Sequence, residues 1–406
     1  MRTDFDILII GGGLVGASLA GALRTSPLRI GIVEATTPSA PTQPSCDERT
    51  LALAYGSKRI FEGMGVWSDI APGVTPIERI HISDRGHFGF TRLNAADAGL
   101  PALGYVVENR ALGAALRKTL EGSQNVEWLC PATMQDIRFQ PEAATVAVHR
   151  NGATRTVTAR LIVAADGARS AVREAVGIAA VHTDYAQTAI VTSVAIGRPH
   201  GNTAYERFTA TGPLALLPVR GQRCAVVWSV PAAAAETLLG PSDEEFLARL
   251  QAHFGDRLGA FTRLARRAAH PLALTRVAEH VRARLALIGN AAHTVHPVAG
   301  QGFNLGLRDV AVLSEVLIEA LRAGRDIGDL EVLRQYARSR GRDIRATSAF
   351  TDGLIRVFSN DIAPVVVARN LGLIAVDLMP PVKRGLMRLT GGLAGRLPRL
   401  ARGLPL

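Results

Sequence analysis

The feature that most constrains the fold of this chain is a glycine-rich hexapeptide that directly follows an apolar run. Residues 5–10 have the composition of a buried parallel strand, and residues 14–23 that of a helix packed on it. Between them, Gly11, Gly13 and Gly16 fit the spacing G-x-G-x-x-G. The first glycine permits a tight turn, the second admits a pyrophosphate, and the third lets the helix approach the strand. The pattern predicts a Rossmann-type nucleotide-binding unit.

A carboxylate after the next apolar run indicates which nucleotide this unit prefers. Leu28–Val33 predicts a second parallel strand, and Glu34 follows it directly. A carboxylate at this position can bind both ribose hydroxyls, which disfavours a 2′-phosphate and therefore NADP. The phosphates themselves would lie at the helix N-terminus, where free N–H groups favour anions. The motif alone does not separate FAD from NAD.

Two later motifs repeat the arrangement of a buried strand followed by a turn. The apolar runs are Val157–Ala164 and Leu285–Ile288, and each leads directly into a glycine turn. The last motif continues to an amphipathic helix that the spacing predicts from Phe303 to Arg322. The residues of these two motifs that we expect to line a cofactor are Asp166, Gly167, Gly289, Asn290, Pro297, Gly300, Gln301, Gly302 and Asn304.

Length and composition exclude several other classes of protein. The 406 residues are 48% hydrophobic, which suffices for two domains or one large α/β unit. Three dispersed cysteines without a C-x-x-C pair argue against a disulfide framework, a zinc site or an iron–sulfur cluster. His293 and His296 form H-x-x-H, but no third ligand lies at useful spacing, so we expect no metal. We also expect neither a signal peptide nor a membrane-spanning helix.

The positive charge of the chain is concentrated near its C-terminus. The formal net charge is +11, and the segment Leu378–Leu406 contains no acidic residue. Two interpretations remain open at this stage. The segment could dock on an anionic membrane surface, or it could be a solvated or disordered tail. No nucleic-acid-binding motif is present, so we expect no nucleic-acid partner. The basic residues are Lys383, Arg384, Arg388, Arg396, Arg399 and Arg402.

Taken together, the motifs resemble the flavin-dependent aromatic hydroxylases typified by p-hydroxybenzoate hydroxylase. Within that family the chain is most similar to the ubiquinone-biosynthesis hydroxylases, in particular those that act on a 2-polyprenyl-6-methoxyphenol. The resemblance extends over nearly the whole chain. Besides the glycine motifs, the segments that carry it include Asp47-Glu48-Arg49, Ile82–His87, Glu206-Arg207-Phe208, Gly212–Pro218, His270–Leu274, Gly289–Asp309 and Asn360–Asn370.

The resemblance implies an α/β fold with three parts. A Rossmann-type, p-hydroxybenzoate hydroxylase-like FAD-binding domain would comprise residues 1–74, 103–180 and 271–330. A substrate domain built on an antiparallel sheet would comprise residues 75–102 and 181–270, where short strands such as Ile190–Ile196 alternate with turns. A C-terminal helical region, including the basic tail, would comprise residues 331–406.

The resemblance also implies the reaction. NAD(P)H would reduce FAD, O2 would form a C4a-hydroperoxyflavin, and hydroxylation of a 2-polyprenyl-6-methoxyphenol in ubiquinone biosynthesis would follow. Three alternatives remain open: another ring position or another aromatic substrate, a flavin oxidase or dehydrogenase without oxygen insertion, and a non-catalytic FAD-containing quinone-binding or scaffold protein. We expect a cytoplasmic protein, peripheral on the inner face of the cytoplasmic membrane and available to a ubiquinone-biosynthesis assembly, because a polyprenyl tail remains in the bilayer.

Residue roles follow from the same resemblance. Arg49 and Arg110 would contact FAD, Asp166-Gly167 would contact the pyrophosphate region and serve the use of NAD(P)H, and Gly289-Asn290 would contact the ribityl chain. Asn290 replaces the aspartate common in the family, which removes a negative charge near the flavin. No acid or base is assigned. The segment expected to line the isoalloxazine ring contains Pro297, Gly300, Gln301 and Gly302.

Overall fold

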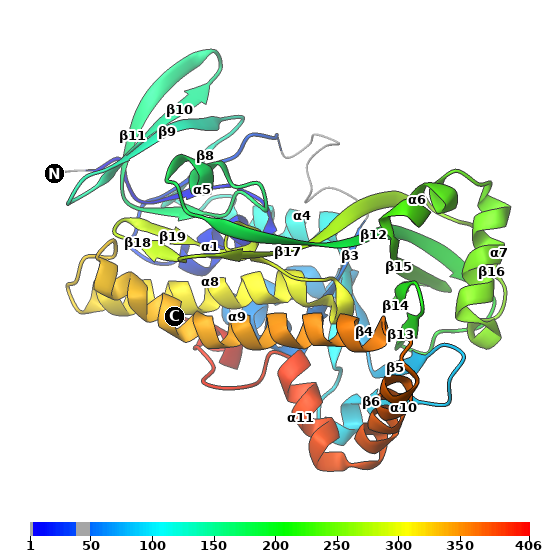
Figure 1. Ribbon diagram of the computed structural model, residues 1–406. Helices are drawn as coiled ribbons and strands as arrows, with labels where there is room; N and C mark the ends of the chain where they lie inside the picture. Colours follow the sequence, from blue (N-terminus) through cyan, green and yellow to red (C-terminus); the bar gives the residue numbers. More distant parts are fainter. Residues whose placement is uncertain (1–2, 38–48) are drawn as a thin grey trace.

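The protein folds around a parallel sheet and a second, larger sheet, with long helices along one side (Figure 1). The computed structural model describes residues 3–37 and 49–406. Asp47 and Glu48, which contribute to the family resemblance, lie outside the described residues.

The first sheet is the predicted nucleotide-binding sheet. Pairs β1–β2, β1–β11, β2–β8 and β11–β19 are parallel, which requires crossover connections and buries both faces of the sheet. The apolar runs read from the sequence therefore form its centre. In sheet order the strands are β18 (Val281–Arg282), β19 (Leu285–Leu287), β11 (Ala153–Ala164), β1 (Phe5–Ile10), β2 (Ile30–Val33) and β8 (Val126–Leu129), with β10 (Ala144–Arg150) and β9 (Thr133–Phe139) paired beyond β11.

Helices cover one face of this sheet. The first of them is apolar on all sides because it lies between the sheet and two further helices, and its residues 16–23 are all buried. The helix α8 of this layer begins at Gln301, so the predicted start near Phe303 was two residues late. The helices of this layer are α1 (Leu14–Leu23), α4 (Asn109–Leu120), α8 (Gln301–Arg322) and α9 (Leu330–Phe358), and the short α5 (Ala171–Ala175) follows β11.

The second sheet is mainly antiparallel, as the short alternating strands predicted, although β13 and β5 pair in parallel. Its strand order is β20 (His293–Thr294), β17 (Ala268–Val277), β12 (Ala180–Ile196), β15 (Arg223–Pro231), β14 (Gly212–Val219), β13 (Thr203–Thr209), β5 (Arg79–Asp84) and β6 (Phe90–Asn94), with β16 (Phe261–Thr262) paired to β12. Two helices, α6 (Ala232–Leu239) and α7 (Asp243–Phe254), close a separate core around Trp228. The strand β17 crosses the expected domain boundary at residue 270, and the domain division stays a prediction.

A small third sheet joins the two larger parts. It consists of β3 (Thr50–Ala54), β7 (Gly104–Glu108) and β4 (Thr75–Ile77), all antiparallel. The helices α2 (Tyr55–Gly63) and α3 (Trp67–Ile70) follow β3. Ile77 and Val106 of this sheet pack with Ala204 of β13, so the small sheet contributes to the contact with the second sheet.

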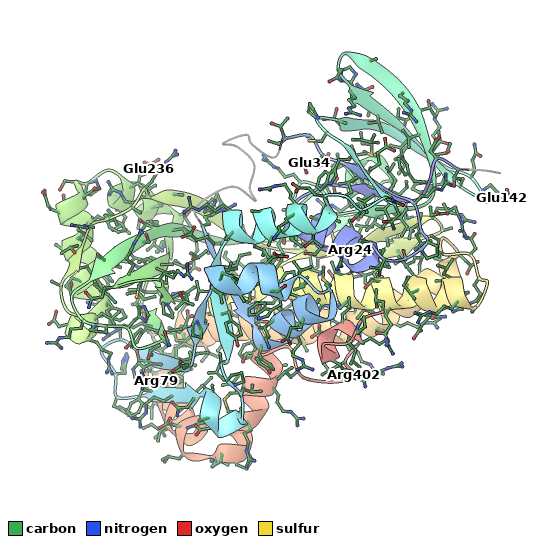
Figure 2. The ribbon with its side chains drawn as sticks, turned by 180° about the vertical axis from the view of Figure 1, so that it is seen from behind. Arg24, Glu34, Arg79, Glu142, Glu236 and Arg402 are labelled. Carbon is green, nitrogen blue, oxygen red and sulfur yellow. The ribbon has the colours of Figure 1, made fainter. Side chains whose placement is uncertain are left out.

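The C-terminal segment is folded onto the protein, which contradicts the interpretation of a solvated or disordered tail. It forms α10 (Ala363–Leu378), α11 (Pro380–Thr390) and the short turn η7 (Leu400–Arg402). Met387, Leu400 and Ala401 are buried, and η7 lies against α2; Figure 2 labels Arg402 in this returning segment. Gly391 ends α11 and Gly403 ends η7, while Pro398 precedes η7, and none of them prevents packing. Deletion of residues 378–406 would therefore remove part of the core.

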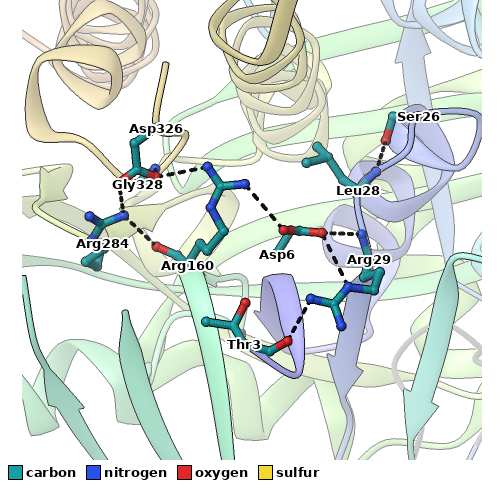
Figure 3. Close-up of polar contacts among 9 residues, drawn as sticks. All are labelled: Thr3, Asp6, Ser26, Leu28, Arg29, Arg160, Arg284, Asp326 and Gly328. Carbon is teal, nitrogen blue, oxygen red and sulfur yellow. Dashed lines mark hydrogen bonds and ion pairs between the residues drawn. The ribbon is translucent and has the colours of Figure 1, made fainter. Parts of the chain in front are cut away.

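An ion-pair network ties together the amino-terminal edge of the first sheet (Figure 3). Arg160 on β11 binds Asp6 on β1 at 3.4 Å and Asp326, after α8, at 3.3 Å. Arg284 contacts the other oxygen of Asp326 at 2.5 Å, and the backbone N–H of Arg29 donates to Asp6 at 2.8 Å. Burial opposes ionisation of Asp326, but the Gly328 N–H and the arginines lower its pKa. This edge is occupied by structural contacts, which leaves the opposite edge for the site.

Candidate active site

The three glycine motifs meet at the carboxyl-terminal edge of the first sheet. Ile10 pairs with both Val33 and Ala164, and Ala164 pairs with Leu287, so four strands end at one level. Hydrogen bonds continue across this edge, because the N–H of Ala165 donates to the carbonyl of Ile10 at 2.8 Å. In open parallel sheets, ligands bind outside these strand ends. The fold therefore places all three predicted motifs around one space.

The first turn has the geometry that its glycine spacing predicts. Gly11 has φ +105°, and a Cβ on Gly16 would lie 2.0 Å from the Gly11 carbonyl oxygen. By contrast, no atom of the described residues lies within 4 Å of the Cβ position of Gly13, which faces open space at the start of α1. Gly16 is thus needed for packing, whereas Gly13 leaves room for a ligand at the helix N-terminus.

Glu34 lies beside this turn, and Figure 2 labels it at the end of β2. Its Oε2 accepts a hydrogen bond from the Gly12 N–H at 2.7 Å, and its Oε1 accepts one from the Thr36 N–H at 2.9 Å. These bonds hold the carboxylate in place, and each oxygen keeps a second lone pair for a ribose hydroxyl.

Asp166 leaves an acceptor atom unused at the same edge. Its Oδ2 accepts from the Val172 N–H at 3.0 Å, whereas Oδ1 is buried without a hydrogen-bond partner among the described residues. Gly167 has φ +87°, and its Cβ position also faces open space in the described structure. A buried acceptor without a partner is costly unless a ligand or water binds it. This observation fits a bound FAD, whose hydroxyl groups are donors.

A buried charge cluster holds the third motif. Asp309 on α8 accepts from the Gly289 N–H at 2.9 Å and from His293 Nε2 at 2.7 Å, and its other oxygen contacts Arg340 Nε of α9 at 2.6 Å. Burial by itself would raise the pKa of Asp309, but His293 and Arg340 lower it well below its usual range. The cluster orients Gly289 and leaves Asn290 exposed toward the site. His293 is therefore an ion-pair partner here.

The segment before α8 turns sharply through left-handed residues. Ala299 has φ +58° and Gly300 has φ +62°, and the Cβ position of Gly302 faces open space in the described structure. Non-glycine residues in this conformation are uncommon and cluster at functional sites. The Gly300 N–H donates to the Pro297 carbonyl at 2.8 Å and closes the turn. We call residues Pro297–Gly302 the flavin loop.

Two predicted contact residues also support the flavin loop in the structure. The Gln301 side chain is buried and donates to the carbonyls of Ala299 at 3.1 Å and Thr390 at 3.2 Å, so it anchors the flavin loop to α11. Asn304 accepts from the Ala54 N–H at 2.8 Å and donates to the carbonyls of Ala52 at 2.8 Å and Gly300 at 2.6 Å. The Gln301 amide nitrogen and the Asn304 amide therefore support the loop, and the contact of these two residues with FAD stays a prediction.

The two predicted arginines lie together at the start of α4. The N–H of Asn109 donates to the Arg49 carbonyl at 2.8 Å, and Arg110 is the next residue along the helix. The Arg110 guanidinium is exposed and donates to Glu108 at 2.7 Å. Their contact with FAD stays a prediction.

Residues of the second sheet complete the site from the opposite side. Phe208 of β13 packs with Val298 of the flavin loop and stacks on Phe358 at a centroid distance of 3.8 Å. The Ala299 N–H faces the carboxylate of Glu206, which lies two residues earlier than Phe208 on the same strand, and it lowers the pKa of that carboxylate. Burial raises the pKa of Glu206 to about 7. In the sequence, Glu206 stood out only as part of a motif of the family. Strand residues two apart lie on the same face of a sheet, so the spacing of Glu206 and Phe208 was the signal that could have placed both on one side.

His296 and Tyr185 lie next to the loop as well, with ring centroids 5.2 Å apart. His296 accepts from the Val298 N–H at 3.1 Å and lies 3.1 Å from Gln187, and burial lowers its pKa to about 4, so it is neutral. Burial also raises the pKa of Tyr185 to about 12. The described residues contain no cluster of side chains suited to a metal ion.

Comparisons with known proteins agree with this geometry. Residues 4–351 match the FAD binding domain family. The ubiquinone hydroxylase UbiL of Rhodospirillum rubrum is 41% identical over 99% of this chain and 93% of its own length. The 3-demethoxyubiquinol 3-hydroxylase of Escherichia coli is 33% identical over 96% of this chain and 98% of its own length. The p-nitrophenol 4-monooxygenase of Pseudomonas putida shares the fold, with a TM-score of 0.81 at 18% identity over 98% of this chain and all of that one.

The site and fold are those of a FAD-dependent monooxygenase that uses NAD(P)H and O2 on an aromatic substrate. The chain belongs to the family of flavin-dependent ubiquinone-biosynthesis hydroxylases, as the motifs had indicated. The p-hydroxybenzoate hydroxylase-like fold class is likewise confirmed.

The two glycines of the first turn generate a matched prediction. Gly13 has φ −65° and open space around its Cβ position, so Gly13→Ala should leave the apoprotein stable. The added methyl would meet the pyrophosphate, and FAD should bind about tenfold more weakly or worse, a loss of about 1.4 kcal/mol or more. Gly16→Ala should instead destabilise the apoprotein by about 1–3 kcal/mol. Titration with FAD and chemical denaturation measure the two effects; equal FAD affinity in Gly13→Ala would contradict the assignment.

The charge cluster generates a second prediction. Asp309→Asn should lower the free energy of unfolding by about 3–5 kcal/mol, because it leaves buried His293 without its counter-charge and buried Arg340 with Asp343 alone. Because the folded-state pKa of Asp309 is depressed, its contribution is present above the unfolded value of 3.8 and is lost as the pH falls. Denaturation of Asp136→Asn, which affects an exposed ion pair, is the control and should differ from wild type by under about 1 kcal/mol. If the two variants had similar free energies of unfolding, the stabilising role of Asp309 would be contradicted.

Proposed function

We propose that the protein hydroxylates the ring of a 2-polyprenyl-6-methoxyphenol with O2 and NAD(P)H in ubiquinone biosynthesis. The observation that supports this most is the placement of the flavin loop directly beneath Glu206 and Phe208 of the second sheet. An aromatic ring held beside Glu206 would have a carboxylate within reach and the apolar cluster of Phe208, Val298 and Phe358 behind it, next to the segment that faces the flavin. The names of the R. rubrum and E. coli relatives support a substrate with a ubiquinone-type ring.

A second ring position has support of its own. The E. coli relative is a 3-demethoxyubiquinol 3-hydroxylase, which hydroxylates a ring carbon other than the one we propose. Both relatives match nearly the whole chain, so similarity alone does not select the position. The position must follow from how the ring is oriented over the flavin loop.

The protein's own residues would bind the cofactor and exclude water. Gly13, Glu34, Asp166 and Asn290 would hold the pyrophosphate, ribose and ribityl parts of FAD at the strand ends. FAD, when bound, supplies electron transfer from NAD(P)H and the activation of O2. The start of α8 directs backbone N–H groups at the flavin loop, which favours negative charge there.

A single-turnover experiment tests the proposed reaction. FAD-loaded protein is mixed with NAD(P)H, 18O2 and a short-tail 2-prenyl-6-methoxyphenol, and the products are read by mass spectrometry. We expect one 18O atom in the para-quinol, because one oxygen atom of O2 enters the ring. Flavin reduction with only H2O2 as product would point to another substrate or to an oxidase. No reduction of the flavin would support a binding or scaffold protein.

We also propose that the protein docks on the inner face of the cytoplasmic membrane, through a surface that combines α10 with the first part of the predicted tail. Large exposed apolar side chains gather on α10, α11 and the neighbouring turn before β6, at the lower right of Figure 1. Basic Arg384 and Arg388 lie on the same helix α11. We call this the α10–α11 surface, and its apolar residues are Phe88, Phe90, Ile362, Val367, Leu371, Leu378, Met379 and Val382.

This surface suits interfacial contact. In the described residues no helix alone has the length and apolar content of a membrane span; α10 and α11 meet those criteria only as a pair, which is bent by 97°. Exposed apolar side chains next to arginines favour the boundary of an anionic bilayer. A polyprenyl substrate requires such access, since removing each CH2 from the bilayer costs roughly 0.8 kcal/mol.

Binding to vesicles that contain anionic phospholipid tests the docking proposal. The double substitution Leu378→Ser and Met379→Ser removes two side chains that are 72% and 50% exposed, so the fold should persist. We expect binding to fall roughly tenfold or more, since each inserted apolar side chain contributes of the order of 1 kcal/mol. Phe139→Ser, on the distant β9, is the control and should bind as wild type does. Unchanged binding of the double variant would exclude this surface.

A further inference from the structure

We propose that Glu206 is the proton acceptor for the hydroxyl group of the aromatic substrate. The inference deepens the proposed function and rests on it. No acid or base was assigned from the sequence, although electron donation from a phenol to an oxygen acceptor is far stronger once the phenol is ionised.

The position of Glu206 on its strand is the first argument. Side chains alternate along β13, so Glu206 and Phe208 share one face while Tyr205 and Arg207 share the other. Phe208 packs with Val298, which places its face toward the flavin loop. Tyr205 and Arg207 line a separate cavity of about 300 Å³ on the far side of the sheet. Glu206 therefore belongs to the side that faces the flavin loop.

The flavin loop lies against this carboxylate. The Ala299 N–H faces Glu206 and lowers its pKa, and Ala299 has a left-handed φ of +58°. The Gln301 side chain donates to the Ala299 carbonyl at 3.1 Å, which holds the next peptide of the turn. Glu206 is half-buried, and a carboxylate has acceptor sites beyond the one that the amide uses. A substrate hydroxyl can therefore reach it.

The surroundings of Glu206 suit a group that changes charge during turnover. Its partners on the adjoining strands are Ile82 and Ala215, both apolar. Apolar residues from α9 and α10 also pack around Phe208, and the charged group nearest to them, Arg369 of α10, lies 5.6 Å from the centroid of the Phe358 ring and is paired with Asp84 of β5. The apolar residues are Leu354, Ile355, Phe358 and Leu373.

The nearest titratable groups act elsewhere. His296 is neutral, and Asp352 and Arg356 of α9 act on Tyr185. Burial raises the pKa of Glu206 to about 7, and the Ala299 N–H opposes this effect only in part. A carboxyl with a pKa near neutrality can both accept and release a proton.

The proton transfer balances without a further reagent. The O–H bond of the phenol breaks, a new O–H bond forms on the Glu206 carboxylate, and the electron pair of the broken bond stays on the phenolate oxygen. No oxidant or reductant is consumed in this step. The oxygen atom of O2 that does not enter the ring leaves as water, and the proton on Glu206 completes that water. The carboxylate is thereby regenerated in each turnover.

The test compares FAD-loaded wild type with Glu206→Gln and Glu206→Asp, using 2-methoxy-6-prenylphenol as the probe. The rate of hydroxylation in a single turnover is followed from pH 5 to pH 10. In the wild type the rate should rise as Glu206 loses its proton near pH 7. In Glu206→Gln this rise should be absent, and hydroxylation near pH 8 should be slower by about 10²–10⁴-fold. The deficit should shrink as the pH approaches the pKa of the free phenol, roughly 10, because hydroxide then removes the proton. Glu206→Asp should restore part of the rate.

A stability measurement separates this role from a structural one. The folded-state pKa of Glu206 lies above its unfolded value of 4.5, so the wild-type apoprotein should lose stability relative to Glu206→Gln as the pH rises from 4.5 to about 7. Glu236→Gln, an exposed change on α6, should show no such trend.

The outcomes distinguish the two proposals. If the wild type hydroxylates the probe and Glu206→Gln does so at the same rate with the same pH profile, Glu206 is not the proton acceptor, and the proposed function stands. If the wild type neither binds nor hydroxylates any phenol, the proposed function fails and the role of Glu206 fails with it. A rise of the hydroxylation rate near pH 7 that requires Glu206 supports both.

Discussion

The buried carboxylate of Asp309 is the interaction on which the site most depends. It is fully buried on α8 and binds the Gly289 N–H, His293 and Arg340 at once. The continuous segment of the third glycine turn and β20, and the helix α9, are thereby held against α8. A buried charge is costly unless it is paired and hydrogen-bonded, so this arrangement tolerates little displacement. The same helix begins at the flavin loop, so its position also sets the position of the loop.

The rest of the site is built on rigid backbone. Strand ends at one edge of the first sheet carry Gly11, Glu34, Asp166 and Gly289, while the opposite edge is closed by ion pairs around Asp326 (Figure 3). The side-chain amides of Gln301 and Asn304 donate to backbone carbonyls of neighbouring segments and so hold the flavin loop in position. The second sheet then supplies Glu206 and Phe208 from above the loop. A cofactor bound at the strand ends and a ring beneath the second sheet would meet at the loop.

Much of the first sheet could be predicted from residues alone, because its strands are short apolar runs and its turns require glycine. The φ of Gly11 and the tight approach of Gly16 correspond to what the spacing demands. The roles of Gln301 and Asn304 could not be predicted in this way. Amides of this kind can serve a ligand or the protein equally well, and the choice depends on Thr390 and Ala52, which are distant in the sequence.

The C-terminal segment shows the same limit. Its arginines and leucines are compatible with a membrane-docking tail, a solvated tail or a segment packed on the protein. Only the contact of η7 with α2 decides that Leu400 and Ala401 belong to the core. By itself the sequence determined the nucleotide-binding sheet, the order of its motifs and the family, because local periodicity and glycine spacing express these directly. Only the tertiary structure decided that Asp309 on α8 binds both the third glycine turn and α9, and that Glu206 faces the flavin loop. Both depend on which surfaces pack together, and the energy of a buried charge is set by partners that lie far away in the chain.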